Sequence, residues 1–303
     1  MDTLSKIILI AGATASGKSS FAVKLAKKIN GEIINADSMQ VYKELKILTV
    51  RPSKKNQNNI RHHLYGIQSV KKNFSTGTWL KLVIKKIQEI QKRNRIPIIV
   101  GGTGLYFKAL TEGLVKIPNI PLKIRNKTRL LQAKIGQKKF YQKLIKIDPL
   151  VKNKINLNDV QRSIRAFEIK KFTKKSMFKW FSKTKIFFDT NSFLKIYIDF
   201  PRANLIERIR QRIDGMFEKG AISEVVKFNK LKVKKENSSN KVIGIQEIGK
   251  YLNGELNLNE AKERIYIKTR QYAKRQTTWA RGQMLSWYKI DPNDLSFALK
   301  KFK

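Results

Sequence analysis

Short apolar runs alternate with amphipathic stretches along the first hundred residues. Residues 7–10 are all apolar and predict a buried strand, and residues 21–29 then repeat apolar positions at three- and four-residue spacing, as a helix does. Further strands are predicted at residues 32–36 and 96–100, with a helix between them at residues 79–90. Strands that alternate with helices in this way predict an α/β fold, a parallel sheet that is flanked by helices.

The pattern changes in the middle of the chain and then returns. Basic helical segments without strand signals occupy residues 118–188, after which residues 193–200 again predict a strand. The later part predicts helices at 205–217 and 259–283, a polar loop at 232–241 and a final strand within 285–290. We therefore predict a core formed by residues 1–117 and 189–303, with an all-helical insertion domain at 118–188 between its two parts.

The first predicted strand runs directly into a glycine-rich segment that precedes the first predicted helix. It fits G-x-x-x-x-G-K-[ST] at every fixed position, and strand, loop and helix are the context that this phosphate-binding motif requires. Backbone N–H groups of such a loop close around phosphate oxygens, Lys18 reaches the terminal phosphates, and the Ser19 hydroxyl binds Mg²⁺. The predicted phosphate-binding residues are Gly12, Ala13, Thr14, Ala15, Ser16, Gly17, Lys18 and Ser19.

The next two predicted strands also end in residues that carry chemistry. Asp37 follows the second strand, where it could bind Mg²⁺, cap a turn or act as a general base beside a phosphate-bearing substrate. The third strand ends in a glycine turn that contains Thr103, whose hydroxyl can donate a hydrogen bond to a ligand. A plain tight turn is the alternative for this second segment.

Charge adds a candidate partner. The chain has 65 Lys and Arg against 22 Asp and Glu, a net charge of +43, which suits nucleic acid but also fits a compositional bias of the source genome. Individual arginines are more informative. Arg208 and Arg212 share a helix face and either close over substrate phosphates or pair with Glu207 or Asp214.

The insertion and the last long helix hold further basic positions. Asn158 and Asp159 predict a helix start, after which Gln161 and Arg165 share one face and Arg162 lies alongside. These side chains either contact RNA or form an ordinary solvated surface. The helix at 259–283 interleaves basic and aromatic residues, which suits a nucleic-acid surface or plain amphipathic packing.

Several function classes are disfavoured. The chain has no cysteine, so disulfides and thiolate metal sites are excluded. No apolar run reaches about 18 residues, and the N-terminus leads directly into the first strand, so we expect a cytoplasmic protein without a membrane span. The two histidines, His62 and His63, are adjacent; their side chains diverge, so a two-histidine metal site is not expected.

Five segments in order resemble one known family, the bacterial tRNA dimethylallyltransferases, also called isopentenyl-tRNA transferases. They cover nearly the whole chain and are residues 12–19, 37–42 (DSMQVY), 98–106 (IIVGGTGLY), 158–168 (NDVQRSIRAFE) and 269–276 (TRQYAKRQ). The sequence departs from the family pattern at Leu48, where glycine is usual, and at Ala13, where proline is common.

The resemblance implies an activity for the phosphate-binding loop. A dimethylallyl group would pass from dimethylallyl diphosphate to N6 of the adenosine just 3′ of the tRNA anticodon, so the loop would hold diphosphate as the leaving group. It also implies Mg²⁺, a P-loop NTPase-like core, a monomer and an insertion that grips the anticodon stem-loop. Asp37 would be the catalytic base and Thr103 would hydrogen-bond the bridging oxygen, while Arg212 would join the diphosphate site.

The same resemblance assigns tRNA contacts to three parts of the chain. The predicted tRNA-binding residues are Asp37, Ser38, Met39, Gln40, Thr103, Arg125, Gln161, Arg162, Ser163, Ile164 and Arg165. Two other functions remain as alternatives. One is a P-loop nucleoside or nucleotide kinase in which Asp37 is the base or a metal ligand, and the other is a basic RNA-binding protein with a degenerate active site.

Overall fold

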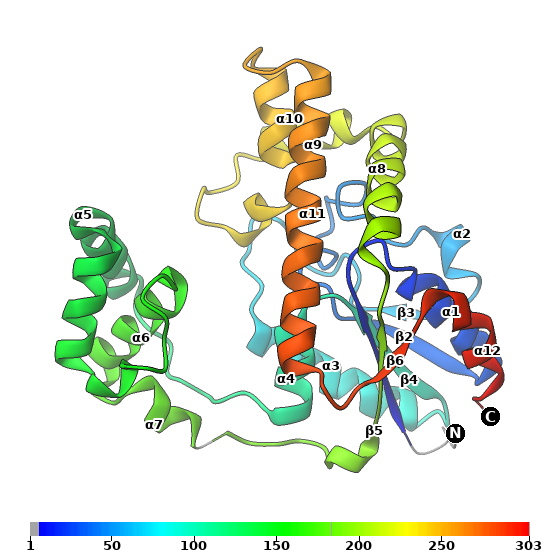
Figure 1. Ribbon diagram of the computed structural model, residues 1–303, viewed down its shortest axis with the longest axis horizontal. Helices are drawn as coiled ribbons and strands as arrows, with labels where there is room; N and C mark the ends of the chain where they lie inside the picture. Colours follow the sequence, from blue (N-terminus) through cyan, green and yellow to red (C-terminus); the bar gives the residue numbers. More distant parts are fainter. Residues whose placement is uncertain (1–5, 183, 303) are drawn as a thin grey trace. The chain divides into compact units, whose positions relative to one another are not determined.

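A computed structural model describes residues 6–182 and 184–302 and shows a parallel sheet with helices on both faces (Figure 1). Within the described residues the sheet has six strands in the order β3-β2-β4-β1-β5-β6, and every neighbouring pair is parallel. The strands are β1 (Ile7–Gly12), β2 (Gly31–Asn35), β3 (His62–His63), β4 (Ile96–Gly101), β5 (Phe193–Ile198) and β6 (Tyr288–Ile290). The predicted α/β class is confirmed.

The chain separates into two compact units, residues 1–111 with 188–303 and residues 112–187. The first unit holds the sheet. Its α-helices are α1 (Lys18–Lys28), α2 (Lys54–Gln57), α3 (Thr76–Gln91), α4 (Gly104–Glu112), α8 (Arg202–Glu218), α9 (Ala221–Lys230), α10 (Ile245–Leu252), α11 (Leu258–Gln283) and α12 (Leu295–Lys300). Short 3₁₀ turns lie at Thr190–Ser192, Ser238–Lys241 and Pro292–Asp294.

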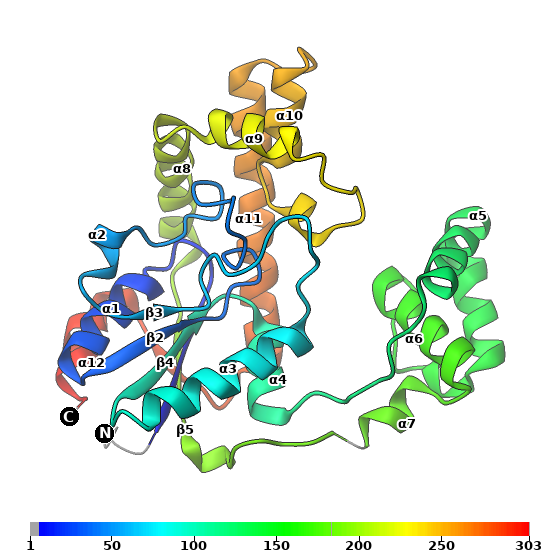
Figure 2. The same ribbon diagram turned by 180° about the vertical axis from the view of Figure 1, so that it is seen from behind.

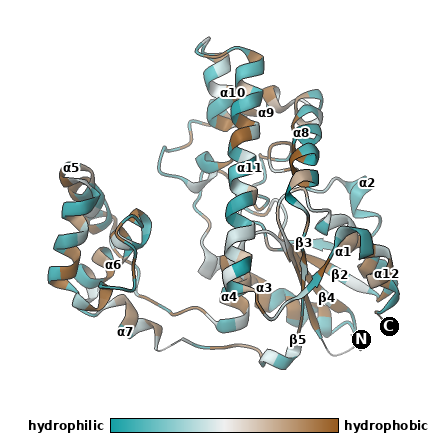
Figure 3. Cartoon of the chain, viewed as in Figure 1, coloured by the Kyte–Doolittle hydropathy of each residue, from teal (hydrophilic) through white to brown (hydrophobic). Residues whose placement is uncertain are grey.

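Burial of both sheet faces explains why β1 and β4 contain no polar side chain. Ile8 and Ile10 point to the face that α1 and α12 cover, where Phe21 and Phe302 meet edge to face at 6.5 Å. α3 and α11 contact the sheet too, and Figure 2 shows α3 running along it. In Figure 3 the strands are predominantly brown, whereas α10 and α11 carry long teal stretches.

A second core joins α8, α9, α10 and α11 to the segment after β2. Leu48, the departure from the family pattern, is buried here at 7% exposure, with its side chain against Gly244. The carboxylate of Glu224 accepts the backbone N–H groups of residues 46, 47 and 48 at 2.7–2.9 Å. A leucine therefore serves as a packing residue at this position.

The second unit is entirely helical among its described residues, as the sequence predicts. It holds α5 (Leu122–Ile147), a 3₁₀ turn (Pro149–Val151), α6 (Val160–Thr173) and α7 (Met177–Phe181). Gly136 interrupts α5 with a φ of 74°, a conformation that favours glycine. Phe140, Phe167 and their apolar neighbours form a separate core. The contact boundaries fall at 112 and 187, where the sequence predicts 118 and 188.

Some local predictions differ from the structure. The apolar spacing predicts no element between residues 37 and 79, but the structure has α2 there, which Ser53 caps by accepting the N–H of Asn56. The predicted final strand is formed only at 288–290, and the polar segment 232–241 ends in a 3₁₀ turn. These elements are short and depend on tertiary contacts, which the spacing of apolar residues in the sequence does not reveal. No helix in the described part of the chain is long and apolar enough to cross a membrane.

Candidate functional site

The glycine-rich segment forms a loop between β1 and α1 with the backbone open toward the solvent. Gly17 has a φ of 84° and Ala15 a φ of 63°, so the chain turns sharply just before the helix. No side chain caps the start of α1 and its first turn has no acidic residue. Its free N–H groups and helix dipole are therefore available to an anion.

The two serines of the loop have different environments. Ser16 is fully buried, and its hydroxyl lies so close beneath Gly12 that a Cβ there would be 2.7 Å away. A side chain at Gly12 would therefore displace Ser16, which does not line the cavity above the loop. Ser19 is exposed and lines the cavity above the loop.

A cavity of about 860 Å³ lies over this loop within the first unit. Its walls bring together residues that the sequence places far apart, including Lys18, Asp37, Gln40, Arg208 and Arg212. Five Lys or Arg residues line the cavity against a single carboxylate, that of Asp37. Such an excess of positive charge in a concave site favours a compact anion with several negative charges.

Arg212 reaches the loop as predicted. Its guanidinium donates to the Thr14 hydroxyl at 2.7 Å, while the alternative partner Asp214 pairs with Lys262. Burial lowers the pKa of Arg212, the charge of Asp37 opposes this shift, and the charge of Arg208 adds to it. Arginine remains protonated at any ordinary pH, so this group supplies a fixed positive charge at the loop.

Arg208 is a site residue that sequence reasoning noted without selecting. Its guanidinium would lie 3.7 Å from a Cβ on Gly17 and stacks on the ring of Phe200 at 4.9 Å. Its position one helical turn before Arg212, on the same helix face, was the sequence feature that could have identified Arg208 as a site residue. Two arginines from α8 therefore lie at the phosphate-binding loop.

Lys18 is held close to its own loop. Its Nζ donates to the carbonyl of Ala13 at 3.0 Å. Burial lowers the pKa of Lys18 from 10.5 to about 8; the charge of Asp37 raises it and that of Arg212 lowers it. An anion that bound beside Nζ would restore the higher pKa, since it favours the charged form.

Asp37 follows β2 and is fixed by hydrogen bonds to its neighbours. Its Oδ1 accepts the N–H of Met39 at 2.8 Å and that of Gln40 at 3.4 Å, and its backbone is bonded on both sides to the Asn35 side chain. Among the described residues no side chain or N–H donates to Oδ2. One carboxylate oxygen thus orients the residue, and the other remains available at the cavity.

The glycine turn after β4 brings Thr103 next to Asp37. A Cβ on Gly101 would meet the carbonyl of Ala36 at 2.1 Å, so only glycine permits this approach. The Thr103 hydroxyl accepts the N–H of Ser38 at 3.0 Å and lies 3.4 Å from the Ser38 hydroxyl. Thr103 therefore forms part of the support for the Asp37 turn and is outside the cavity lining.

Gln276 of α11 joins the two glycine segments. Its Oε1 accepts the N–H of Thr14 at 2.8 Å, and its Nε2 donates to the carbonyl of Gly102 at 2.9 Å. Tyr272, one turn earlier, hydrogen-bonds Thr103 and Gln276, and burial with the charge of Asp37 raises its pKa. The sequence contained both residues in the segment 269–276 but gave neither a role.

The remaining candidates of this unit lie in the turn after Asp37. Ser38 and Met39 are half-buried, and Met39 packs against the second core. The Gln40 side chain donates to the carbonyls of Thr49 and Val50 at 2.9 and 3.2 Å. Gln40 therefore holds the 49–50 segment beside the cavity.

The candidates of the helical unit fall into two groups. Gln161 and Arg162 are exposed at the start of α6, where Asp159 accepts the N–H of Arg162 as the predicted cap. Ser163 is fully buried and Ile164 packs into the core of this unit, so their side chains have structural positions. Arg165 lies 3.4 Å from the buried carboxylate of Glu168.

Arg125 in α5 is half-buried, with an Nε that is enclosed and has no hydrogen-bond partner among the described residues. The histidines have structural contacts: His63 Nε2 lies 2.6 Å from the buried carboxylate of Glu32, and His62 Nδ1 lies 2.8 Å from a backbone carbonyl. No group of three His, Cys, Asp or Glu residues in the described ranges could hold a metal ion by itself.

Comparisons with known proteins agree on one family. The model of the IPP transferase family matches residues 40–283. A protein of Pelagibacter ubique named tRNA dimethylallyltransferase is 63% identical over all of this chain and 97% of its own length, and one of Rickettsia massiliae with the same name is 46% identical over 92% and 77%.

Solved structures give the same result. The tRNA isopentenylpyrophosphate transferase of Bacillus halodurans superposes with a TM-score of 0.71 at 32% identity and covers 98% of this chain and 95% of its own. A eukaryotic dimethylallyltransferase acting on tRNA gives a TM-score of 0.80 at 31% identity over 96% of this chain and 75% of its own. Together with the family match, these similarities show that the chain belongs to the IPP transferase family.

Proposed function

We propose that this enzyme transfers a dimethylallyl group from dimethylallyl diphosphate to N6 of the tRNA adenosine just 3′ of the anticodon. The observation that carries the proposal is a single cavity in which a phosphate-binding loop and two arginines face one carboxylate. The cations suit the diphosphate, and the carboxylate suits the proton that the accepting amine must lose. The names of the curated relatives support the same reaction.

In the proposed reaction the amine nitrogen forms a bond to the first carbon of the dimethylallyl group while the bond from that carbon to oxygen breaks. Diphosphate leaves with the electron pair of the broken bond, and Asp37 accepts the proton of the amine through its unoccupied Oδ2. Lys18, Arg212 and the N–H groups at the start of α1 stabilise the negative charge that develops on the diphosphate. Thr103 keeps the Asp37 turn in place through Ser38.

Mg²⁺ fits this site as a shared ion. Ser19 is exposed and lines this cavity, so its hydroxyl can contribute an oxygen ligand while Asp37 remains free to act as the base. Mg²⁺ is commonly bound through one or two protein side chains together with substrate phosphates and water. The ion would neutralise charge on the diphosphate as it leaves.

The accepting base lies within a stacked anticodon loop and has to be flipped out to reach Asp37. We propose that Gln161 and Arg162, exposed at the start of α6, contact the anticodon stem-loop, together with Ser38 to Gln40 beside the cavity. Ser163 and Ile164 position these two residues from within the helical unit. Because tRNA is the substrate, we propose that the enzyme acts in the cytoplasm. We also propose that it is a monomer, as the family resemblance implies.

Incubation of the protein with tRNA and either labelled dimethylallyl diphosphate or γ-labelled ATP tests the proposal. Label is expected to enter tRNA only from the prenyl donor. The Lys18→Ala variant is the control for the loop and should abolish this incorporation. Phosphate transfer from ATP would indicate the kinase alternative, and tRNA binding without transfer would indicate an RNA-binding protein.

A further inference from the structure

Tyr65 lines the cavity over the phosphate-binding loop together with Asp37. It follows β3, the strand beside β2, and so lies at the same edge of the sheet as Asp37. The segment that carries Asp37 holds the backbone on both sides of Tyr65. The carbonyl before it accepts from the Asn35 side chain at 3.2 Å, and the N–H after it donates to the Gln40 carbonyl at 2.9 Å. Tyr65 is therefore fixed beside the proposed base.

The hydroxyl of Tyr65 is available to a ligand. It makes no hydrogen bond with the described residues, and they do not enclose it. The ring is packed against His62 with 5.6 Å between the centroids, and His62 Nδ1 in turn lies 2.8 Å from the carbonyl of Ile60. Burial and the charge of Asp37 raise the pKa of Tyr65, so the phenol stays protonated and can donate a hydrogen bond.

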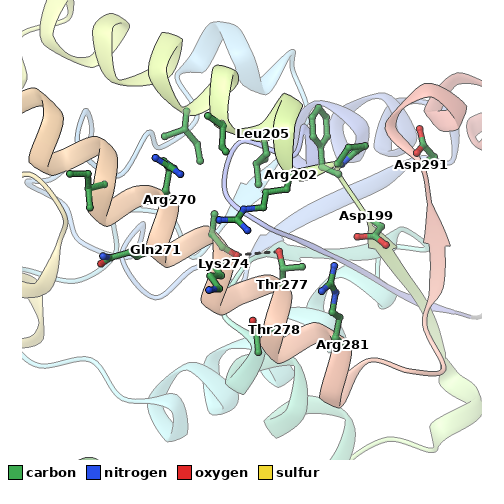
Figure 4. A pocket seen from close by; sticks show the side chains of 16 residues that line it. Asp199, Arg202, Leu205, Arg270, Gln271, Lys274, Thr277, Thr278, Arg281 and Asp291 are labelled. Carbon is green, nitrogen blue, oxygen red and sulfur yellow. Dashed lines mark hydrogen bonds between the residues drawn. The ribbon is translucent and has the colours of Figure 1, made fainter.

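Two other tyrosines lie near Asp37 without lining this cavity. Burial and the charge of Asp37 raise the pKa of both Tyr106 and Tyr272. The ring of Tyr106 stacks on Trp79 at 4.3 Å, and Tyr272 hydrogen-bonds other side chains of the site. The neighbouring cavity between α8 and α11 (Figure 4) is lined by neither Tyr65 nor Asp37. Among the described tyrosines, Tyr65 is thus the one that lines the same cavity as the proposed base.

A hydrogen-bond acceptor and a donor that line one cavity match one edge of adenine. Enzymes that act on a flipped base read its Watson–Crick edge by hydrogen bonds. In adenine this edge carries the N6 amine, which donates, next to N1, which accepts. The carboxylate of Asp37 accepts and the hydroxyl of Tyr65 donates. The two groups are not hydrogen-bonded to each other, so a base can lie across both.

We propose that the Tyr65 hydroxyl donates a hydrogen bond to N1 of the accepting adenine and so directs its N6 amine toward Asp37. The inference rests on the proposed prenyl transfer and adds a specificity-determining residue for the acceptor. Guanine carries a carbonyl oxygen where adenine carries the amine, and that oxygen would face the carboxylate. The contact does not involve the diphosphate, which Lys18, Arg212 and the loop hold.

Anticodon stem-loop RNAs with adenosine or 1-deazaadenosine at the accepting position test this contact. The analogue has C–H in place of N1 and keeps the amine. Tyr65→Phe removes only the hydroxyl and should lower kcat/KM for the adenosine RNA about tenfold, as expected for one hydrogen bond. With the analogue, wild type and Tyr65→Phe should agree within twofold. The analogue alters the reactivity of the amine equally for both proteins, so the difference between the two ratios reports the contact with N1.

Tyr288→Phe, at a site that is 41% exposed, is the matched control and should retain kcat/KM within twofold for both RNAs. Melting temperatures verify that the variants are folded, and the KM for dimethylallyl diphosphate should stay within twofold in Tyr65→Phe. The inference is overturned if Tyr65→Phe has no effect with adenosine or lowers kcat/KM equally for both RNAs. An increase in the KM for dimethylallyl diphosphate with equal ratios would assign the hydroxyl to the prenyl donor instead.

Dissociation constants of the two RNAs, measured by competition, give the same comparison of ratios without turnover. If wild type transfers no prenyl group to the adenosine RNA, the proposed function fails, whereas the contact with N1 is still tested by binding. Equal losses of affinity for the two RNAs in Tyr65→Phe would overturn the contact even if prenyl transfer is demonstrated.

Discussion

The side chain of Gln276 accepts the backbone N–H of Thr14, 262 residues earlier in the chain, at 2.8 Å and so joins the phosphate-binding loop to α11. Its other end donates to Gly102 at 2.9 Å, in the turn that carries Thr103. The amide group of Gln276 therefore fixes the position of the phosphate-binding loop relative to the turn that supports Asp37.

Gln276→Ala should lower kcat/KM for dimethylallyl diphosphate about 30-fold. Two hydrogen bonds of about 1 kcal/mol each are lost, and each 1.36 kcal/mol corresponds to a factor of ten. Steady-state kinetics measures the effect. Gln283→Ala removes an exposed glutamine of the same helix, which accepts a hydrogen bond from Lys108, and should change kcat/KM less than twofold. Equal effects of the two changes would contradict the bridging role.

Asp37→Asn should lower kcat about 10²- to 10⁴-fold, the usual contribution of a general base. The amide oxygen can still accept the N–H of Met39, so the turn should persist and the tRNA dissociation constant should stay within twofold. Single-turnover kinetics and gel shift give the two values. Asp159→Asn, at the cap of α6, should retain kcat. Near-normal turnover by Asp37→Asn would show that Asp37 is not the general base.

Binding of diphosphate should weaken as the pH rises through about 8. The pKa of Lys18 is lowered to about 8 in the free protein, so the charge is present below that pH and is lost above it. An anion that requires the charge loses up to about tenfold in affinity per pH unit above the pKa. Calorimetric titration with inorganic diphosphate from pH 7 to 9 measures this dependence.

The Lys18→Arg variant is the control for this pH dependence, because arginine stays protonated. Ionisation of the ligand affects both proteins equally, so the difference between their profiles reports Lys18. Identical profiles for the two proteins would show that Lys18 does not titrate in this range.

Gln161→Ala/Arg162→Ala should weaken tRNA binding and lower its dependence on salt by about one counterion, if Arg162 contacts a phosphate. Filter binding at several salt concentrations measures both quantities. Gln142→Ala/Lys143→Ala is the matched control, since it also removes one exposed amide and one exposed cation from the helical unit. Unchanged tRNA binding would indicate that the start of α6 is an ordinary solvated surface without an RNA contact.

Leu48→Gly should destabilise the protein by about 3 kcal/mol, the usual cost of deleting a buried leucine side chain. Leu48 is 7% exposed in the second core. Urea unfolding measures the loss, and Leu285→Ala, at a site that is 78% exposed, should change the free energy of unfolding by less than about 0.5 kcal/mol. A similar small effect at Leu48 would show that glycine can be accommodated there.

The sequence by itself determined the features that depend on neighbouring residues. Apolar periodicity predicted the long strands and helices, because their burial repeats at fixed spacing, and the residues 12–19 predicted the phosphate loop, because its backbone geometry needs glycine at fixed positions. The cap of α6 at Asp159 was likewise local. The order of the motifs along the chain also carried the family resemblance.

Only the tertiary structure decided which distant residues meet. Arg208, Gln276 and Tyr272 join the site through the packing of α8 and α11 against the sheet, and no local pattern encodes that approach. The packing of α5 against α6 buries Ser163 in the helical unit, and the core formed by α8, α9, α10 and α11 takes up Leu48. Side-chain function in this protein depends on contacts between segments far apart in sequence, and such contacts exist only once the sheet and its helices have assembled.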